Sequence, residues 1–283
     1  MIVHRYIGSH LKDSLQNSEL KVAKVSEFND PFEFRYRYVG EFGFAQAAIK
    51  LQNHLKDDWF LRRLRMIPRF KLLSTDKILE VFENEKESIL SAMVSNIPRA
   101  FDALPAENQD LANELVRILC FSLPSENRNE EILRWSHYTN CHNGARISIE
   151  LSKQQPPLSI VYPVRYNNTL VSVEFGRTTE AQYIRDKIRD SMTTKSECWS
   201  YEGEVRSFIP KPHFHTRTQN GRDYDFVKIN LDGIERIDFG IRFPESDIGA
   251  IIELFNKGNY TKVKFYRAFC SSSDYSIKYT EIC

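Results

Sequence analysis

A change of sequence pattern divides the chain into three segments and limits the folds that it can adopt. Residues 1–40 and 117–283 contain short runs with strand-like alternation, separated by turn residues and a few helical stretches. Residues 41–116 are instead rich in Leu, Ala, Glu, Lys and Gln at helical spacing, interrupted by prolines. Because strands precede and follow this segment, the pattern predicts one α+β domain, formed by 1–40 and 117–283. We expect a mixed or antiparallel central sheet, with 41–116 inserted as a helical subdomain.

The individual elements of the outer segments follow from their periodicity. Helices are expected at residues 131–138 and 178–192, and between Pro244 and Gly258. The polar, proline-bearing segment 210–222 is expected to be a loop. Strands are expected at 2–7, 21–26, 117–122, 145–151, 159–166, 203–209, 226–231, 234–239 and 262–269.

The charge of the chain is high but balanced. Charged residues make up 27% of the 283 residues, and the formal net charge is only +1. A balanced total argues against wholesale electrostatic binding of nucleic acid, although a local patch remains a candidate. The basic cluster of the helical block is such a patch, and it consists of Arg62, Arg63, Arg65 and Arg69.

Cysteine usage and hydropathy indicate the compartment. The five cysteines are scattered and form no C-x-x-C motif, which is typical of a reduced, cytoplasmic protein. The N-terminus does not resemble a signal peptide, and no apolar run is long enough to span a bilayer. We therefore expect a cytoplasmic protein with no membrane partner.

The stretch 195–206, KSECWSYEGEVR, combines acids, bases and aromatic residues more densely than any other part of the chain. In an extended conformation, Glu202 and Glu204 would lie on one side of the backbone. Lys195, Trp199 and Arg206 are close to them in sequence. Such a pattern is either the edge of a functional site or an exposed ladder of ion pairs, and the sequence leaves both interpretations open.

A second motif, FNDPFEF at residues 28–34, has the composition of a tight turn. Asn29 and Asp30 can bond to their own backbone, and Pro31 keeps Asp30 out of the helical region. Phe28 and Phe32 flank the turn as apolar anchors. The turn is either a buried structural feature or a loop that contacts a ligand.

A third motif, at residues 135–144, is the other dense polar and aromatic cluster. No metal is expected there, because His137 and Cys141 lack a second pair at ligand spacing, and no frame for a serine or cysteine nucleophile is present. The simplest interpretation of His137 is a hydrogen-bonded, partly buried histidine. The candidate residues of this motif are Trp135, Ser136, His137, Tyr138 and His142.

Together these motifs contain the groups needed to break an N-glycosidic bond. Phosphate-loop and dinucleotide-binding glycine motifs are absent, which disfavours a Walker-type ATPase or a Rossmann enzyme. Arg5 or Arg206 would hold a phosphate. A base or nicotinamide ring would stack on Tyr6, Tyr138 or Trp199. A carboxylate, Glu202 or Glu204, would bond ribose hydroxyls and stabilise positive charge at the anomeric carbon.

The order of the motifs resembles a known family. HRYIGSHL, SEFNDPFEF, WSHYTNCHNG, VRY, KSECWSYEGEVR and IERIDFG occur here in one order. In this respect the chain resembles the bacterial family known as domain of unknown function number 2971, nearly from end to end, and it is more distantly similar to ADP-ribosyltransferase-like folds. The family itself implies little chemistry, but members of such families often act in toxin or phage-defence systems.

The more distant similarity implies roles for individual residues. Arg5 or His4 would bind the phosphate or ribose of NAD, the substrate. Tyr138 or Ser136 would line the nicotinamide pocket, and Glu204 would be the catalytic glutamate. The second motif of such enzymes would correspond either to Ser26 or to the cluster that begins at Trp135. ADP-ribose would then pass to a protein or nucleic-acid target.

Two other function classes remain open. One is a nucleic-acid-binding or nuclease effector that uses Arg62, Arg63 and Arg65 together with residues 135–142. The other is a non-enzymatic sensor or interaction module, in which all of these residues are structural.

Overall fold

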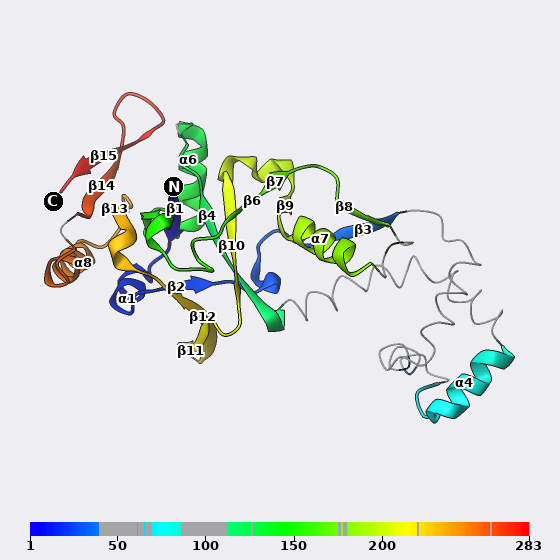
Figure 1. Cartoon of the computed structure of the whole chain (residues 1–283). Helices are drawn as coiled ribbons and strands as arrows, with labels where there is room; N and C mark the ends of the chain where they lie inside the picture. The colour runs from blue at the N-terminus through cyan, green and yellow to red at the C-terminus, as the bar shows by residue number, and fades with distance from the viewer. Residues whose placement is uncertain are drawn as a thin grey trace. The chain divides into compact units, whose positions relative to one another are not determined.

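A computed structural model describes residues 1–39, 61, 65, 70–85, 113–125, 127–174, 177, 180–219, 221–260 and 262–282 (Figure 1). The chain forms two compact units. The first consists of Met1–Phe34, Gln109–Thr169 and Met192–Cys283, and the second of Arg35–Asn108 and Leu170–Ser191. Most of the predicted helical block lies outside the described residues, as do Arg62, Arg63 and Arg69. Arg65 is described, and its Nη2 donates to Thr75 Oγ1 at 2.9 Å.

The first unit is built on a mixed sheet of eight strands among the described residues, which confirms the predicted α+β class. The strand order is β15-β14-β13-β5-β1-β4-β10-β6. Strands β13 and β14 are parallel, and the other neighbouring pairs are antiparallel. The strands are β1 (Ile2–Ile7), β4 (Val116–Ser122), β5 (Ala145–Glu150), β6 (Tyr162–Pro163), β10 (Glu204–Pro210), β13 (Ile234–Phe239), β14 (Lys264–Cys270) and β15 (Ile277–Glu281).

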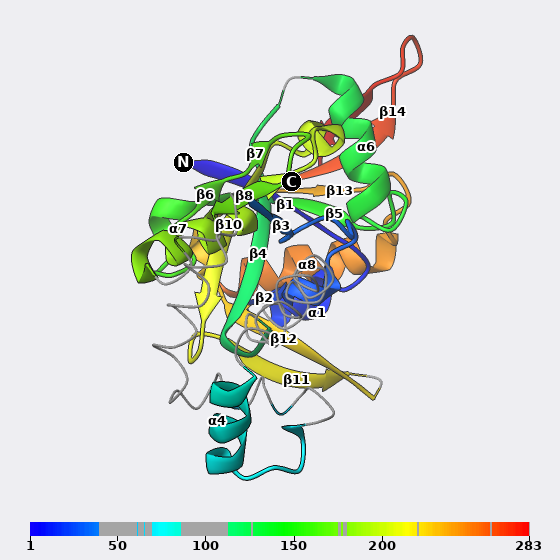
Figure 2. The same cartoon turned by 90° about the vertical axis from the view of Figure 1, so that its right-hand side faces the viewer.

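Helices cover both faces of this sheet. Helices α1 (Leu11–Gln16) and α8 (Glu245–Lys257) lie on one face, and α6 (Arg128–Tyr138) lies on the other (Figures 1 and 2). Strand β1 contributes to an apolar core on each face of the sheet, because successive side chains of a strand point to opposite faces. Val3 and Ile7 join the main apolar core, whereas Tyr6 packs edge-on against Trp135 of α6, with ring centroids 5.6 Å apart. The sheet therefore holds the N-terminal strand near its centre, with helices over both faces.

Smaller elements complete the first unit. A three-stranded sheet contains β11 (His215–Gln219), β12 (Arg222–Lys228) and β2 (Glu19–Val22) in that order. Strands β7 (Arg165–Tyr166) and β9 (Thr194–Lys195) form a short parallel pair. The 3-10 helices found in the described part of this unit are η1 (Val25–Glu27), η3 (Leu151–Lys153), η5 (Glu197–Glu202) and η6 (Leu231–Gly233).

The second unit contains a parallel pair of strands, β3 (Tyr36–Val39) and β8 (Val171–Glu174). Its helix α4 (Thr75–Asn84) begins after Ser74, whose side chain accepts from the Lys77 N–H as a normal N-cap does. Helix α7 (Ala181–Met192) belongs to this unit as far as Ser191.

Two expectations from the sequence are corrected. The segment 210–222 is not only a loop, because β11 pairs with β12 along five residues. Its β-branched Thr216 and Thr218 alternate with His215 and Arg217, a strand period that the polar composition concealed. The strand expected at 159–166 is divided into the two short strands β6 and β7.

Candidate functional site

The central strands bring distant parts of the chain into one row. Strand β4 lies between β1 and β10, and Ser122 of β4 is opposite both His4 and Glu204. Cys120 of the same strand is opposite Arg206. The register therefore places the acidic start of β10 level with His4 of β1, with only β4 between the two strands.

The stretch 195–206 is not a continuous strand. Lys195 ends β9, η5 runs from Glu197 to Glu202, and β10 begins only at Glu204. Between the two carboxylates, Gly203 has a φ of 51°, a left-handed conformation that glycine adopts without steric cost. The expectation that Glu202 and Glu204 share one face of a strand is therefore wrong.

Both carboxylates nevertheless meet at the same ammonium group. Lys195 Nζ lies 2.6 Å from Glu202 Oε2, 3.5 Å from Glu204 Oε2 and 3.0 Å from Glu33 Oε1. Arg206 contacts Glu33 and holds Glu204 with two bonds, of 2.7 Å from Nε and 2.9 Å from Nη2. Every side chain of this buried ion cluster is at most 5% exposed, so the cluster is not an exposed ladder of ion pairs.

The ion cluster shifts the pKa values of Glu202 and Glu204 in opposite directions. Burial on its own would raise the pKa of Glu204, but the Arg206 and Lys195 charges outweigh it and lower that pKa to about 2. At Glu202, burial dominates and raises the pKa, although Lys195 and a hydrogen bond from the Tyr138 hydroxyl partly oppose it. Glu204 is therefore a fixed anion, whereas Glu202 is the carboxylate that can exchange a proton.

The FNDPFEF turn supports this cluster. The rings of Phe28 and Phe34 lie 5.2 and 5.3 Å from the Arg206 guanidinium carbon and contact each other edge-on. Asp30 is buried, and its Oδ1 accepts the Phe32 N–H at 2.9 Å, which is an Asx turn. The turn is thus structural at Asp30, and it supplies Glu33, which the sequence did not single out.

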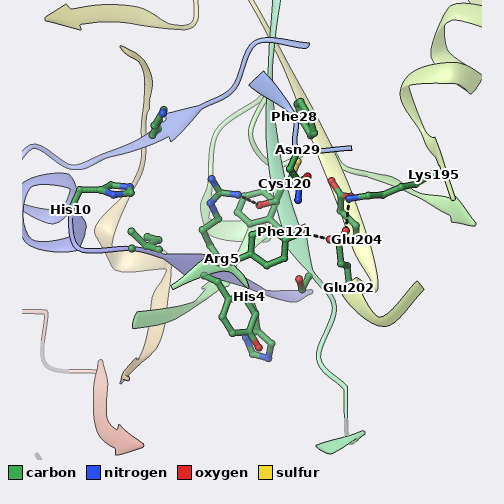
Figure 3. A pocket seen from close by; sticks show the side chains of 16 residues that line it. His4, Arg5, His10, Phe28, Asn29, Cys120, Phe121, Lys195, Glu202 and Glu204 are labelled. Atoms are coloured by element: carbon green, nitrogen blue, oxygen red, sulfur yellow. Dashed lines mark hydrogen bonds and ion pairs between the residues drawn. The ribbon is translucent and has the colours of Figure 1, made fainter. Parts of the chain in front are cut away.

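A pocket of about 210 Å³ lies against the ion cluster. Arg5 and His10 lie on one side of it, and Lys195, Glu202 and Glu204 lie on the other (Figure 3). The lining residues come from seven elements, β1, β2, β4, β9, β10, η5 and α6, and from the turns at residues 8–10 and 28–29. They include Tyr6, Asn29 and Tyr138. Of the predicted site residues outside the ion cluster, Arg5, Tyr6, Asn29 and Tyr138 line this pocket. The other six do not line it: Asp30, Trp135, Ser136, His137, His142 and Trp199.

Other candidates of the 135–144 motif form a separate group. Trp135 is fully buried, and its Nε1 donates to Tyr279 Oη at 3.0 Å. The His142 ring stacks on Trp135, and His142 Nε2 lies 3.3 Å from Ser136 Oγ. None of these three residues lines the pocket. Their contacts assign them to the packing of α6 on the sheet.

Glu202 and Glu204 form the acidic wall of the pocket, and His137 and Trp199 lie beside it without lining the pocket. The exposed His137 bonds through Nδ1 to Tyr201 Oη at 2.8 Å, and its ring centroid is 6.4 Å from that of Trp199. Lys195 Nζ lies 4.7 Å from the centre of the Trp199 ring, a cation–π contact. Arg206 is fully buried and is a support of the acidic wall.

No group of three or more His, Cys, Asp or Glu side chains in the described part of the chain is arranged to hold a metal ion. None of the helices described has both the length and the apolar character needed to cross a bilayer.

No protein family model matches the chain, and no curated protein or solved structure is significantly similar to it. The family resemblance of the motifs therefore stays a prediction.

Proposed function

We propose that the pocket binds a phosphorylated nucleoside, with NAD as the first candidate, and that the protein breaks the N-glycosidic bond of this ligand. The activity would be that of an ADP-ribosyltransferase-like enzyme, with water or a hydroxyl of a protein or nucleic acid as the acceptor. The observation that carries this proposal is the pairing, in one pocket, of a cationic side at Arg5 with a wall formed by Tyr138, Glu202 and Glu204.

The two carboxylates suit two different steps of such a reaction. When the bond between the anomeric carbon and the pyridinium nitrogen of NAD breaks, its electron pair stays on nitrogen and the sugar becomes positively charged. Glu204, whose pKa is lowered, remains negative and stabilises that charge. The acceptor O–H then adds to the anomeric carbon and releases a proton, which Glu202 accepts because its pKa is raised. Charge and atoms balance without a further reactant.

Tyr138 and Lys195 position the base. The Tyr138 hydroxyl donates to one oxygen of Glu202, and Lys195 Nζ contacts the other at 2.6 Å. Both carboxylate oxygens are thus held from two sides. An orientation fixed by two partners lowers the cost of aligning the base with the acceptor.

The test is turnover of NAD by the purified chain, followed as release of free nicotinamide, alone and with protein and nucleic-acid acceptors from a lysate. We expect Glu202→Gln to lower kcat by roughly 100-fold or more, since this is the usual contribution of a general base. Glu253→Gln is the matched control, because Glu253 lies on the exposed face of α8, where it pairs with Lys257. Absence of turnover by the folded wild-type protein under all of these conditions would refute the proposal.

A further inference from the structure

Three basic side chains from three different segments line the cationic side of the pocket. Arg5 belongs to β1, Lys21 to β2, and His10 to the turn before α1. His10 is close enough to the other two that the Arg5 and Lys21 charges both act on its ring. Figure 3 shows His10 and Arg5 on the same side, away from Glu202.

These basic side chains differ from the buried arginines of the first unit, because no described carboxylate forms an ion pair with them. Arg5 donates through Nη1 to the carbonyl oxygen of Cys120 at 2.7 Å, and the Lys21 ammonium lies 4.3 Å from the Tyr224 ring centre. Arg206, by contrast, binds two buried carboxylates. Two other buried arginines also form an ion pair with a buried acid: Arg117 pairs with Asp225, and Arg146 pairs with Asp238.

The acid nearest in sequence to His10 is already occupied. Asp13 accepts from Arg217 Nη2 at 2.6 Å and from Gln219 Nε2 at 3.1 Å. Among the described residues, no carboxylate therefore forms an ion pair with Arg5, His10 or Lys21, and only the more distant charges of Glu204 and Asp13 act on Arg5 and His10. Partial loss of hydration lowers the pKa of both Arg5 and His10, and for His10 the two neighbouring cations add to this effect. An anion placed among the three groups would offset both the loss of hydration and the repulsion between the positive charges.

We infer that Arg5, His10 and Lys21 form a binding site for a pyrophosphate or a terminal phosphate carrying two negative charges. The guanidinium offers a planar fork to two phosphate oxygens, the ammonium contributes a point charge, and the imidazole adds a directional donor. The site and the carboxylates occupy opposite sides of the pocket. A ligand that spans it has its phosphate at Arg5 and its sugar at Glu202, an orientation that rests on the proposed function.

A ligand that carries a phosphate should bind this site more tightly than the same ligand without the phosphate. We expect ligands that lack phosphate, such as adenosine, to bind much more weakly than AMP or ADP. The difference amounts to roughly 10- to 100-fold, the usual effect of a charge-assisted hydrogen bond. The preference will decline as salt is added, because part of the attraction is Coulombic.

The experiment measures binding of pyrophosphate, AMP, ADP and adenosine by calorimetry at low salt, for the wild type, Lys21→Met and His10→Gln. Lys21→Met is expected to weaken pyrophosphate and AMP by about 10-fold or more and to leave adenosine unchanged. His10→Gln is expected to weaken the same two ligands by a smaller factor. Lys264→Met is the matched control, since Lys264 is exposed on β14 and away from the pocket. Thermal melts of each variant establish that it is folded.

The outcomes separate this site from the proposed reaction. Pyrophosphate binding that Lys21→Met weakens supports the site even if NAD is not turned over. The inference is overturned if the folded wild type binds none of the phosphates. It is overturned equally if adenosine and AMP bind alike, or if Lys21→Met and Lys264→Met have the same effect.

Discussion

Lys195 Nζ lies 3.0 Å from Glu33 Oε1, and this ion pair joins two motifs that are far apart in the chain. Glu33 follows the turn after η1, whereas Lys195 ends β9. Since Lys195 also contacts Glu202 and Glu204, the geometry of the acidic wall depends on the turn at residues 28–34. The FNDPFEF motif is thus a support of the pocket as well as a contributor of Asn29 to its lining.

Glu33→Gln should therefore destabilise the protein. The change removes one buried charge and leaves Lys195 and Arg206 with fewer partners, which typically costs about 3–5 kcal/mol. The measurement is the free energy of unfolding in urea at pH 7, compared with the exposed Glu253→Gln, which should change it by less than about 0.5 kcal/mol.

A double-mutant cycle then tests whether the contact itself is responsible. Glu33→Gln and Lys195→Met should be less destabilising together than the sum of the two single changes, because each single change leaves an unpaired buried group. Strict additivity of the two effects would show that the pair is not energetically coupled.

The stability of the protein should depend on pH through Glu204. Its folded pKa of about 2 is below the ordinary value of 4.5, so the ionised carboxylate stabilises the fold above pH 4.5. This contribution, about 3 kcal/mol for such a shift, is lost as the pH falls from 4.5 toward 2. Burial raises the pKa of Glu33 and Glu202, and their contribution has the opposite sign: it is lost as the pH rises above 4.5.

Comparison with Glu204→Gln isolates the effect of this residue. The difference in unfolding free energy between the wild type and the variant should be largest near pH 6 and decrease below pH 4.5. The measurement is urea unfolding at a series of pH values. A difference that stays constant down to pH 3 would contradict the assigned pKa.

The local pattern of the sequence predicted the sheet better than it predicted the site. Strand β1 and helix α8 follow directly from their periodicity, with α8 ending before Gly258 as expected. Glu33, in contrast, has no signal of its own between Phe32 and Phe34. Its importance comes from a tertiary contact with Arg206, which no local pattern encodes.

The same distinction explains the two sides of the pocket. Glu202 and Glu204 were conspicuous because they are close in sequence, although the strand inferred for Glu202 was wrong. His10 and Lys21 were not conspicuous in the sequence, because single basic residues on short elements are common on protein surfaces. Only the tertiary structure, in which Ala23 after β2 bridges Ile118 of β4, shows that they line one pocket with Arg5.

Tyr138→Phe should change the pH dependence of the proposed reaction. The Tyr138 hydroxyl donates to Glu202, and this hydrogen bond lowers the pKa of that carboxyl against the effect of burial. Without it, the pKa of Glu202 rises further, so the acidic limb of the kcat/KM profile for NAD should move to higher pH. A merely structural role for Tyr138 would lower activity equally at every pH and leave the limb in place.

Trp199 should report on ligands that reach the acidic wall. Its ring lies under the Lys195 ammonium, at 4.7 Å, and is half-buried, whereas Trp135 is fully buried in the contact between α6 and the sheet. A ligand that contacts Lys195 will alter the field at the Trp199 ring, so its emission should change on binding. We expect Trp199→Phe to remove most of the fluorescence change caused by AMP or NAD while the calorimetric affinity falls only slightly. If the full change persists in Trp199→Phe, the ligand does not approach this side of the pocket, and the orientation with the sugar at Glu202 is wrong.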